Sequence, residues 1–518
     1  KGRAGWYVNL LRKQGDGWRD LFFGLNDVMA KLNVTLNDHH RLAWKFGGYD
    51  ERSNSTYLGL TESQFRRDPG FNAVPDDFLR IRRYAGSLAH TFTLSPSAVL
   101  NTTAFGYSTT RNWRRQDFDR ARAAGVEYLN IVGNPAIRGD AIYLRNSTGN
   151  NNREFDVIGG ESRLGIELSR QRIETGFRYL YEEHRDRRVD GTSYIASTGM
   201  TREYEVRNGH AASAYIQDRI FLTPRLTLTP GLRFERYRYV RDIRRQPVAG
   251  VPTDVSIQRG DSVMKPIPGL GIAYQAAGPL TLFAGVHRGF APPRIKDAIT
   301  RSGVSLELDA ELSWNYEAGA RLALARGLRA EATVFETDFS NQIIPAAVSG
   351  GATTSLVNAG RTLHRGAEFS LAADWARLTR TGLFTEVRYT WLPVARFESA
   401  EYAGNRLPYA PKATVSLEAG WRHRSGFQIG VDGTRAGSQF ADNRETRQPS
   451  ADGTTGLIPA YWVWNASAGK EFAREQYSVR PYITVKNMAD ALYISSRAPL
   501  GIQPGMARQV NGGIRLRF

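Results

Sequence analysis

Hydrophobic side chains recur at every second position over much of the chain. From Asp27 to Leu36 every even-numbered residue is apolar and most odd-numbered residues are polar. The alternation resumes through Leu42, Trp44 and Phe46, and it closes the chain from Val510 to Phe518. A strand with this pattern has one apolar and one polar face. The sequence therefore predicts strands that each separate an oily phase from water.

Two kinds of connection join these predicted strands. Short turns occur at Leu94–Ser97 and Ala277–Pro279, whereas polar, Gly- and Arg-rich stretches at 111–152, 241–260 and 439–459 are expected to be long loops. Short turns at one end and long loops at the other are typical of an outer-membrane barrel. A sheet exposed to lipid must also close on itself, because hydrocarbon cannot satisfy a free edge. At about 23 residues per strand and connection, the chain holds about 20–22 strands in one domain.

Composition excludes several other classes of protein. Cys is absent, so no disulfide framework, thiol nucleophile or thiolate metal site is possible. No run approaches the ~18–20 apolar residues that a transmembrane helix requires. A propeller or a β-solenoid is also rich in strands, but either requires a repeat of fixed length, and the connections here vary widely. No nucleophile elbow or phosphate-binding loop occurs, so no enzyme is predicted, and the acidic pair Glu182-Glu183 is interpreted as solvated loop charge.

Several stretches resemble the TonB-dependent outer-membrane transporters, most closely the ferric dicitrate receptors. The resemblance spans essentially the whole chain and its motifs follow the family's order. It implies an all-β, 22-stranded antiparallel transmembrane barrel, of which residues 1–518 would supply about 20 strands. We expect the N-terminal plug, the TonB box and the first two strands to be absent from this chain. The motifs are 25–31 with 59–62, 288–297, 438–443 with 450–459, and 485–493.

The resemblance also implies a function. The parent protein would take up a ferric chelate, ferric citrate or a similar anionic carboxylate siderophore, across the bacterial outer membrane. Energy would come from the TonB–ExbB–ExbD complex through the missing N-terminal region. Iron would arrive wrapped in its chelator, so no cofactor and no metal held by side chains is expected. Outer-membrane lipid and lipopolysaccharide are the other expected partners.

The excess of basic over acidic residues suits an anionic ligand. There are 69 Lys and Arg against 51 Asp and Glu, a formal charge of +18. Such a field attracts anions, and guanidinium groups pair bidentately with carboxylates. Nucleic acid is not an expected partner, because the charges are spread over many predicted loops without a recognisable binding module. The arginines concerned are Arg111, Arg114, Arg115, Arg120, Arg122, Arg153, Arg163, Arg185, Arg187, Arg188, Arg202, Arg207, Arg241, Arg244 and Arg245.

The resemblance carries ligand-binding roles onto three positions of this chain. Arg111 and Arg153 fall at two arginine positions of the ferric dicitrate receptors. At a third, the match places Tyr204, and Arg202, expected on the same strand face, is the substitute. Trp113 is the aromatic expected to contact the ligand.

Two further positions, usually polar amides in those receptors, are Ala347 and Ala498. These departures favour an anionic iron chelate in general over citrate in particular.

Other interpretations stay open from the sequence. The arginines could bind lipopolysaccharide phosphates or remain solvated. The chain could be a passive diffusion pore or an adhesin-like binding barrel without a plug, which predicts steady conductance in bilayers. An extracellular β-rich binding protein would instead be soluble without detergent.

Overall fold

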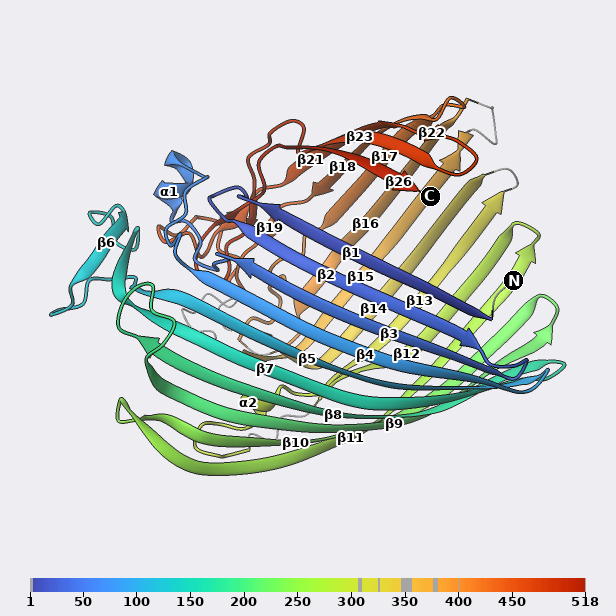
Figure 1. Ribbon diagram of the computed structural model, residues 1–518, viewed down its shortest axis with the longest axis horizontal. Coiled ribbons are helices and arrows are strands. Elements are labelled where there is room, and N and C mark those ends of the chain that lie inside the picture. The colour runs from blue at the N-terminus through green and yellow to red at the C-terminus, as the bar shows by residue number, and fades with distance from the viewer. Residues whose placement is uncertain are drawn as a thin grey trace. The chain divides into compact units, whose positions relative to one another are not determined.

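The computed structural model describes residues 3–305, 310–324, 327–345, 356–375, 381–399 and 401–517. Within these ranges, 22 strands form one large antiparallel sheet (Figure 1). Two of them, β6 and β22, are short additions, and the other twenty agree with the predicted strand number. The strands of this sheet are β1 (Ala4–Gly15), β2 (Phe23–Thr35), β3 (His40–Ser53), β4 (Phe78–Ser95), β5 (Ala98–Asp119), β6 (Tyr128–Gly133), β7 (Ala141–Glu167), β8 (Gln171–Gly191), β9 (Met200–Thr223), β10 (Leu226–Val248), β11 (Val251–Ala277), β12 (Leu280–Ala291), β13 (Glu311–Leu324), β14 (Leu328–Pro345), β15 (Leu356–Asp374), β16 (Leu383–Phe397), β17 (Ala413–Arg422), β18 (Phe427–Ala436), β21 (Tyr461–Lys470), β22 (Phe472–Ala473), β23 (Ser478–Lys486) and β26 (Gln509–Arg517).

The remaining elements are small. Two short hairpins lie outside the large sheet: β19 (Gln439–Phe440) pairs with β20 (Leu457–Ile458), and β24 (Ile494–Ser496) pairs with β25 (Gln503–Pro504). The described ranges also contain two short helices with defined bounds, α1 (Glu62–Arg67) and α2 (Ile295–Ala298). Neither helix among the residues described is long and apolar enough to cross a bilayer.

The chain divides into two compact units. The first comprises residues 1–222, 228–270 and 288–312, and the second comprises 223–227, 271–287 and 313–518. In the first unit the strands β1 to β5 pair in chain order, and so do β7 to β9. Strand β5 pairs directly with β7, and the short strand β6 also pairs with β7. In the second unit β14 to β18 pair in chain order, followed by β21, β23 and β26.

The alternation in the sequence becomes two distinct faces of the sheet. In the first unit Trp6, Leu32, Trp44 and Leu88 stand in one register row across β1 to β4. All four are exposed, and Trp6 retains 79% of its accessible surface. Opposed residues in an antiparallel pair point to the same side, so this row defines an apolar face. The prediction of strands with one oily and one polar face is confirmed.

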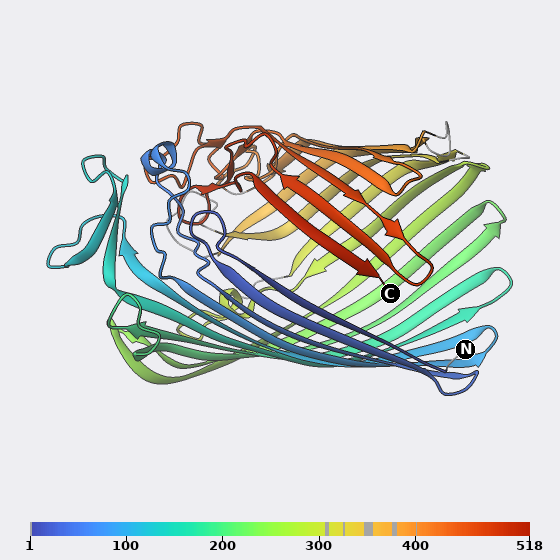
Figure 2. The same cartoon turned by 45° about the horizontal axis from the view of Figure 1, so that its top comes forward.

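The two ends of the strands in the first unit also differ. One end has short turns, at 36–39 and 168–170, while the other carries the longer connections 54–77 and 120–140. These longer connections contain α1 and β6, which lie at the same end of the strands (Figures 1 and 2). We call this the loop end of the first unit.

Two of the predicted long loops are wrong. The stretch 111–152 is mostly strand, because β5 continues to Asp119 and β7 begins at Ala141. In 241–260 the strands β10 and β11 are joined by a two-residue turn at Ala249 and Gly250, both with positive φ. Turns of this kind match the twist of a hairpin. These strand ends are rich in charged residues, Asn, Gly and Pro, so their composition resembles that of a loop, although Val251, Val255 and Ile257 alternate along β11.

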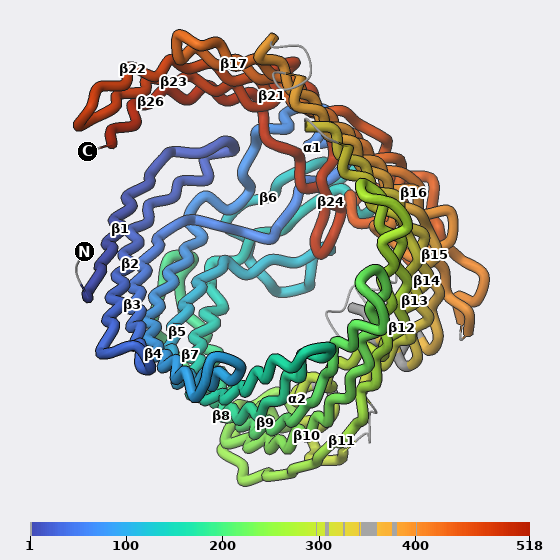
Figure 3. Tube along the Cα trace, turned by 90° about the vertical axis from the view of Figure 1, so that its right-hand side faces the viewer, coloured from blue at the N-terminus to red at the C-terminus, as the bar shows by residue number. Residues whose placement is uncertain are grey.

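The segment that holds α2 packs against the polar side of β10. Ile295, Ala298 and Ile299 form a buried cluster with Tyr237 and Tyr239 of β10. The Cα trace shows α2 beside β9 and β10 (Figure 3). The connection between β12 and β13 is thereby anchored on the sheet of the first unit.

Candidate ligand-binding site

The structure brings Arg111 and Arg153 together. They are register partners on β5 and β7, so their Cβ atoms lie within about 5 Å of each other. On the same two strands Gly106 opposes Ile158, which is 64% exposed and continues the apolar face. Arg111 and Arg153 have the opposite parity on their strands and therefore lie on the polar face. Two arginines that the sequence proposed separately thus form one pair.

A chain of alternating charges extends from this pair across the polar face. The Nε–H of Arg153 donates to Asp186 Oδ1 over 3.1 Å, and Arg207 reaches Asp186 Oδ2 over 2.8 Å. Arg207 also lies 3.1 Å from Glu205, which in turn accepts from Arg241. We call Arg153, Asp186, Arg207, Glu205 and Arg241 the ion chain.

Burial increases along the ion chain. The side chain of Arg153 is 29% exposed and that of Arg241 only 3%. Arg241 also donates to the backbone carbonyls of Lys296 and Ile299, so the ion chain ends on the α2 segment. Arg111 has no carboxylate within ion-pair distance in the described part of the chain. A free anion therefore has the best access to Arg111 and to the exposed end at Arg153.

Trp113 holds the guanidinium groups in place. The Cζ atoms of Arg111 and Arg115 lie 4.7 and 5.0 Å from the centroid of the Trp113 ring. The indole N–H donates to the carbonyl oxygen of Ser55 over 2.8 Å, and Tyr57 meets the ring edge-on at 5.3 Å. Cation–π contacts of this kind orient a guanidinium without neutralising it. Trp113 thus joins the basic cluster to the connection between β3 and β4.

The same connection is fixed by a buried carboxylate. Asp77 Oδ1 accepts from the backbone N–H of Gln116 over 2.8 Å, and the residue is only 4% exposed. Burial raises the pKa of Asp77 to about 6, although hydrogen bonds from Gln116 and Thr56 and the charge of Arg115 oppose the increase. The docking of residues 54–77 beside the site is therefore coupled to pH.

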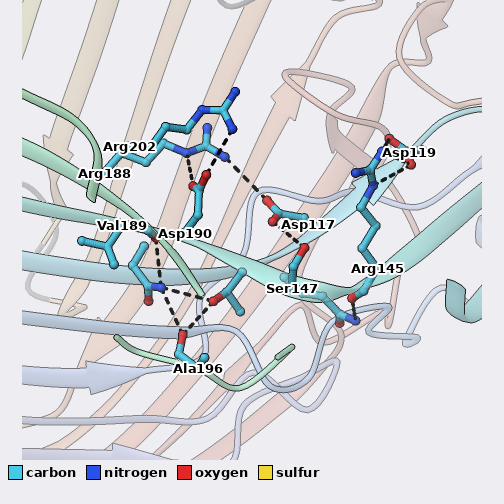
Figure 4. Close-up of polar contacts among 12 residues, drawn as sticks. Asp117, Asp119, Arg145, Ser147, Arg188, Val189, Asp190, Ala196 and Arg202 are labelled. Atoms are coloured by element: carbon cyan, nitrogen blue, oxygen red, sulfur yellow. Dashed lines mark hydrogen bonds and ion pairs between the residues drawn. The ribbon is translucent and has the colours of Figure 1, made fainter. Parts of the chain in front are cut away.

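Arg202 lies in a separate cluster (Figure 4). Its Nη1 is 3.1 Å from Asp190 Oδ2, while Arg188 donates to Asp190 Oδ1 over 3.1 Å and lies 3.7 Å from Asp117. Asp190 is four residues from Asp186 on β8, which places this cluster about 13 Å further along the strand. Arg202 is thus bound to a carboxylate and does not join the pair of Arg111 and Arg153.

The expected common face for Arg202 and Tyr204 is wrong. A β-bulge on β9 leaves Arg202 without a register partner, because Arg188 opposes Glu203 while Val189 opposes Thr201. An extra residue in one strand alters the side-chain alternation. Tyr204 is the register partner of Arg187 and therefore lies on the side away from Asp190.

The remaining predicted positions are quickly placed. Ala498 lies in the connection between β24 and β25, and Ala347 lies outside the described residues. The acidic pair Glu182-Glu183 is part of β8 and not of a loop, and Glu182 accepts a hydrogen bond from Tyr237. Within the described ranges no three His, Asp or Glu side chains gather closely enough to hold a metal ion.

Sequence reasoning missed the acidic members of the site. Asp186 and Glu205 neutralise part of the basic cluster, yet in the sequence they are ordinary charges in polar segments. A one-residue change in strand register would move either carboxylate to the other face. No feature of the sequence alone pairs them with Arg153 and Arg207.

These features define a transmembrane β-barrel protein with a basic ligand site on its polar face. Residues 21–488 match the family of TonB dependent receptor-like β-barrels, and the chain belongs to that family. Members of the family are transporters of the bacterial outer membrane and not enzymes, so the predicted fold class and location are confirmed.

Solved structures show the same fold. The crystal structure of the ferric citrate transporter FecA in the unliganded form is similar at a TM-score of 0.81, with 21% identity over 99% of this chain and 73% of that one. The ferric yersiniabactin uptake receptor FyuA from Yersinia pestis has a TM-score of 0.77, with 17% identity over 99% of this chain and 75% of that one. For the copper transporter OprC these values are 0.75, 13%, 99% and 76%.

Proposed function

We propose that the chain is the barrel of a receptor that takes up a ferric chelate bearing carboxylates, such as ferric citrate or a similar anionic siderophore. The observation that carries this proposal is the register pairing of Arg111 with Arg153 on the polar face. Two adjacent guanidinium groups of which one has no carboxylate partner suit a ligand with several negative oxygens. Two proteins of the same fold are a ferric citrate transporter and a ferric yersiniabactin uptake receptor, and this supports iron chelates as the class of ligand.

The ion chain suggests how the ligand is held. A carboxylate of the chelate binds Arg111 and competes with Asp186 for Arg153, the exposed end of the ion chain. Trp113 keeps the guanidinium of Arg111 oriented while the ligand carboxylate replaces water at that group. Arg202 is proposed only as a peripheral contact, because Asp190 already occupies it.

Transport itself would require the full protein. Energy would reach the barrel from the TonB–ExbB–ExbD complex through an N-terminal plug region. Iron would stay within its chelate, so the chain would carry no resident cofactor. Outer-membrane lipid and lipopolysaccharide would surround the apolar face.

The test is the Arg111→Ala, Arg153→Ala double variant of the full protein that carries this chain, assayed by calorimetric titration with ferric citrate. Charge-assisted hydrogen bonds contribute about 1.5–3 kcal/mol each, so the loss of both arginines should weaken binding by about two to four orders of magnitude. Arg163→Ala is the matched control, because Arg163 lies ten residues along the same strand and face, bound to Glu161. Unchanged affinity in the double variant would remove this pair from the ligand site.

A further inference from the structure

A second basic cleft lies on the polar face of the first unit, further from the loop end than Arg111. Arg83 on β4 and Lys45 on β3 have the opposite parity from the exposed apolar row of these strands, so they share the polar face with Arg111. Ile81 is the register partner of Arg111, and Arg83 follows it by two residues. Because two residues advance about 7 Å along a strand, the cleft begins one register row beyond Arg111.

The cleft has a volume of about 750 Å³ and extends over β2 to β5. Gly47 and Ala85 are register partners and form its low floor. A Cβ atom at Gly47 would meet one atom within 4 Å, the carbonyl oxygen of Val28 at 3.9 Å, so the space above the floor is free. Pockets of this size hold small molecules. Larger side chains also line the cleft, among them Met29, Tyr49, Phe105 and Tyr107.

The lining carries two cations against one carboxylate. The basic residues are Lys45 and Arg83, and the acidic residue is Asp27. Within the described part of the chain, neither Lys45 nor Arg83 has a carboxylate at ion-pair distance. Asp27 and Arg83 are both register partners of Tyr49, so they stand on strands about 10 Å apart. Both cations are therefore available to an anion.

Neighbouring side chains orient these cations without neutralising them. The Cζ atom of Arg83 lies 4.8 Å from the centroid of the Tyr107 ring, a cation–π contact that leaves the guanidinium charge in place. Thr109 is the register partner of Arg83, and Ser87 is the register partner of Lys45. Each cation thus has a hydroxyl group beside it. A carboxylate can accept hydrogen bonds from a cation and a hydroxyl together.

We propose that this cleft is a second binding site for the anionic chelate, which reaches it after leaving Arg111 and Arg153. The inference rests on the proposed function, from which the class of ligand is taken. Both sites lie on one face of the sheet in successive register rows, so passage between them follows a single surface. Lys45 lies four residues, or about 13 Å, beyond the register row of Arg83. Because its cations are this far apart, the cleft binds the chelate more weakly than the adjacent arginine pair, as onward release requires.

Oxidation by the iron of the chelate tests the proposal. With ascorbate and peroxide, bound ferric citrate generates hydroxyl radicals, which convert a nearby Met to its sulfoxide. Met29 lines the cleft, whereas Met264 on β11 is 62% exposed and reports radicals from bulk solution. In the purified full chain we expect Met29 to be oxidised several times faster than Met264, as measured by peptide mass spectrometry. Gallium citrate, which is redox-inactive, gives the background.

Variants of the two cations show whether charge holds the chelate. An Arg83→Gln, Lys45→Gln double variant should lower the ratio of Met29 to Met264 oxidation about tenfold or more, because two charge-assisted contacts are lost. The charge-preserving Arg83→Lys, Lys45→Arg variant should keep most of the ratio. Arg82→Gln is the matched control, because Arg82 adjoins Arg83 on β4 but faces the apolar side. An unchanged ratio in the double variant, or an equal loss in Arg82→Gln, would overturn the proposal.

Oxidation of Trp113 separates this test from a failure of the proposed function. Met29 stands in the register row of Tyr107, which lies six residues, or about 20 Å, from Trp113 along β5. Oxidation of Trp113 above the gallium background, with Met29 no faster than Met264, would retain the arginine pair and overturn the second site. If neither Trp113 nor Met29 is oxidised above that background, the chain does not hold this chelate, and the proposed function fails as well.

Discussion

Replacing Asp186 by Asn should strengthen the binding of an anionic chelate. Asp186 lies 3.1 Å from the Nε of Arg153 and 2.8 Å from Arg207. It therefore pairs with the guanidinium group of Arg153 that a ligand carboxylate would otherwise bind. The amide of Asn has nearly the same shape and keeps one acceptor oxygen for Arg153. Arg207 also keeps its contact with Glu205, so this buried cation retains a carboxylate partner.

The magnitude follows from the geometry of the pair. A ligand carboxylate bound to the free nitrogen of Arg153 would lie about 6 Å from Asp186. At an effective dielectric constant of about 20, the repulsion between two such charges is about 3 kcal/mol, and water and salt reduce it to about 1–2 kcal/mol. Removal of this repulsion corresponds to a gain in affinity of about 5- to 30-fold. The gain should shrink at about 1 M salt, where the screening length falls to about 3 Å.

Calorimetric titration with ferric citrate at several salt concentrations measures this effect. The control is Asp156→Asn, because Asp156 lies on the neighbouring strand β7 but on the other face, 3.7 Å from Arg185. This variant should bind the chelate with unchanged affinity. The reasoning is refuted if Asp186→Asn binds no more tightly than the unaltered protein at low salt while circular dichroism shows an intact fold. In that case Asp186 would serve only to orient Arg153.

Three further predictions concern the surroundings of the site. Trp113→Ala should weaken chelate binding about three- to tenfold through lost cation–π contacts, and Trp113→Phe should restore part of the affinity in the same titration; full affinity in the Ala variant would contradict this role. The pKa of Asp77 is about 6 in the docked state, above its usual value of 3.8. Docking of residues 54–77 should therefore be strongest below about pH 4 and weaken by up to about 3 kcal/mol as the pH rises to about 6. Hydrogen exchange of α1, corrected for intrinsic rates, should show this pH dependence, and the Asp77→Asn variant should lose it. Arg241→Ala leaves the carboxylate of Glu205 buried without this partner and should destabilise the α2 segment by about 3–5 kcal/mol, seen as faster exchange at residues 295–299; unchanged exchange would contradict an anchoring role.

Much of the fold was accessible from the sequence because the pattern that reveals it is local. Alternation through Trp44 and Phe46 identified β3, and the short turn at Leu94–Ser97 separated β4 from β5 where the structure separates them. The same reasoning failed at 241–260, where the many charged residues, Gly and Pro give the hairpin the composition of a loop, although Val251, Val255 and Ile257 alternate along β11. The positions of Arg111 and Arg153 came from the family resemblance and not from any pattern of charge.

The apolar and polar faces of a strand can be predicted from the sequence, because they depend only on position along that one strand. Which residues lie beside one another across strands became known only from the folded sheet. The pairing of Arg111 with Arg153, and the contact of Arg153 with Asp186, depend on the registers of three strands at once. A single bulge was enough to turn Arg202 towards Asp190. Register is set by turns, bulges and packing over the whole sheet, and it is therefore not readable from any one segment.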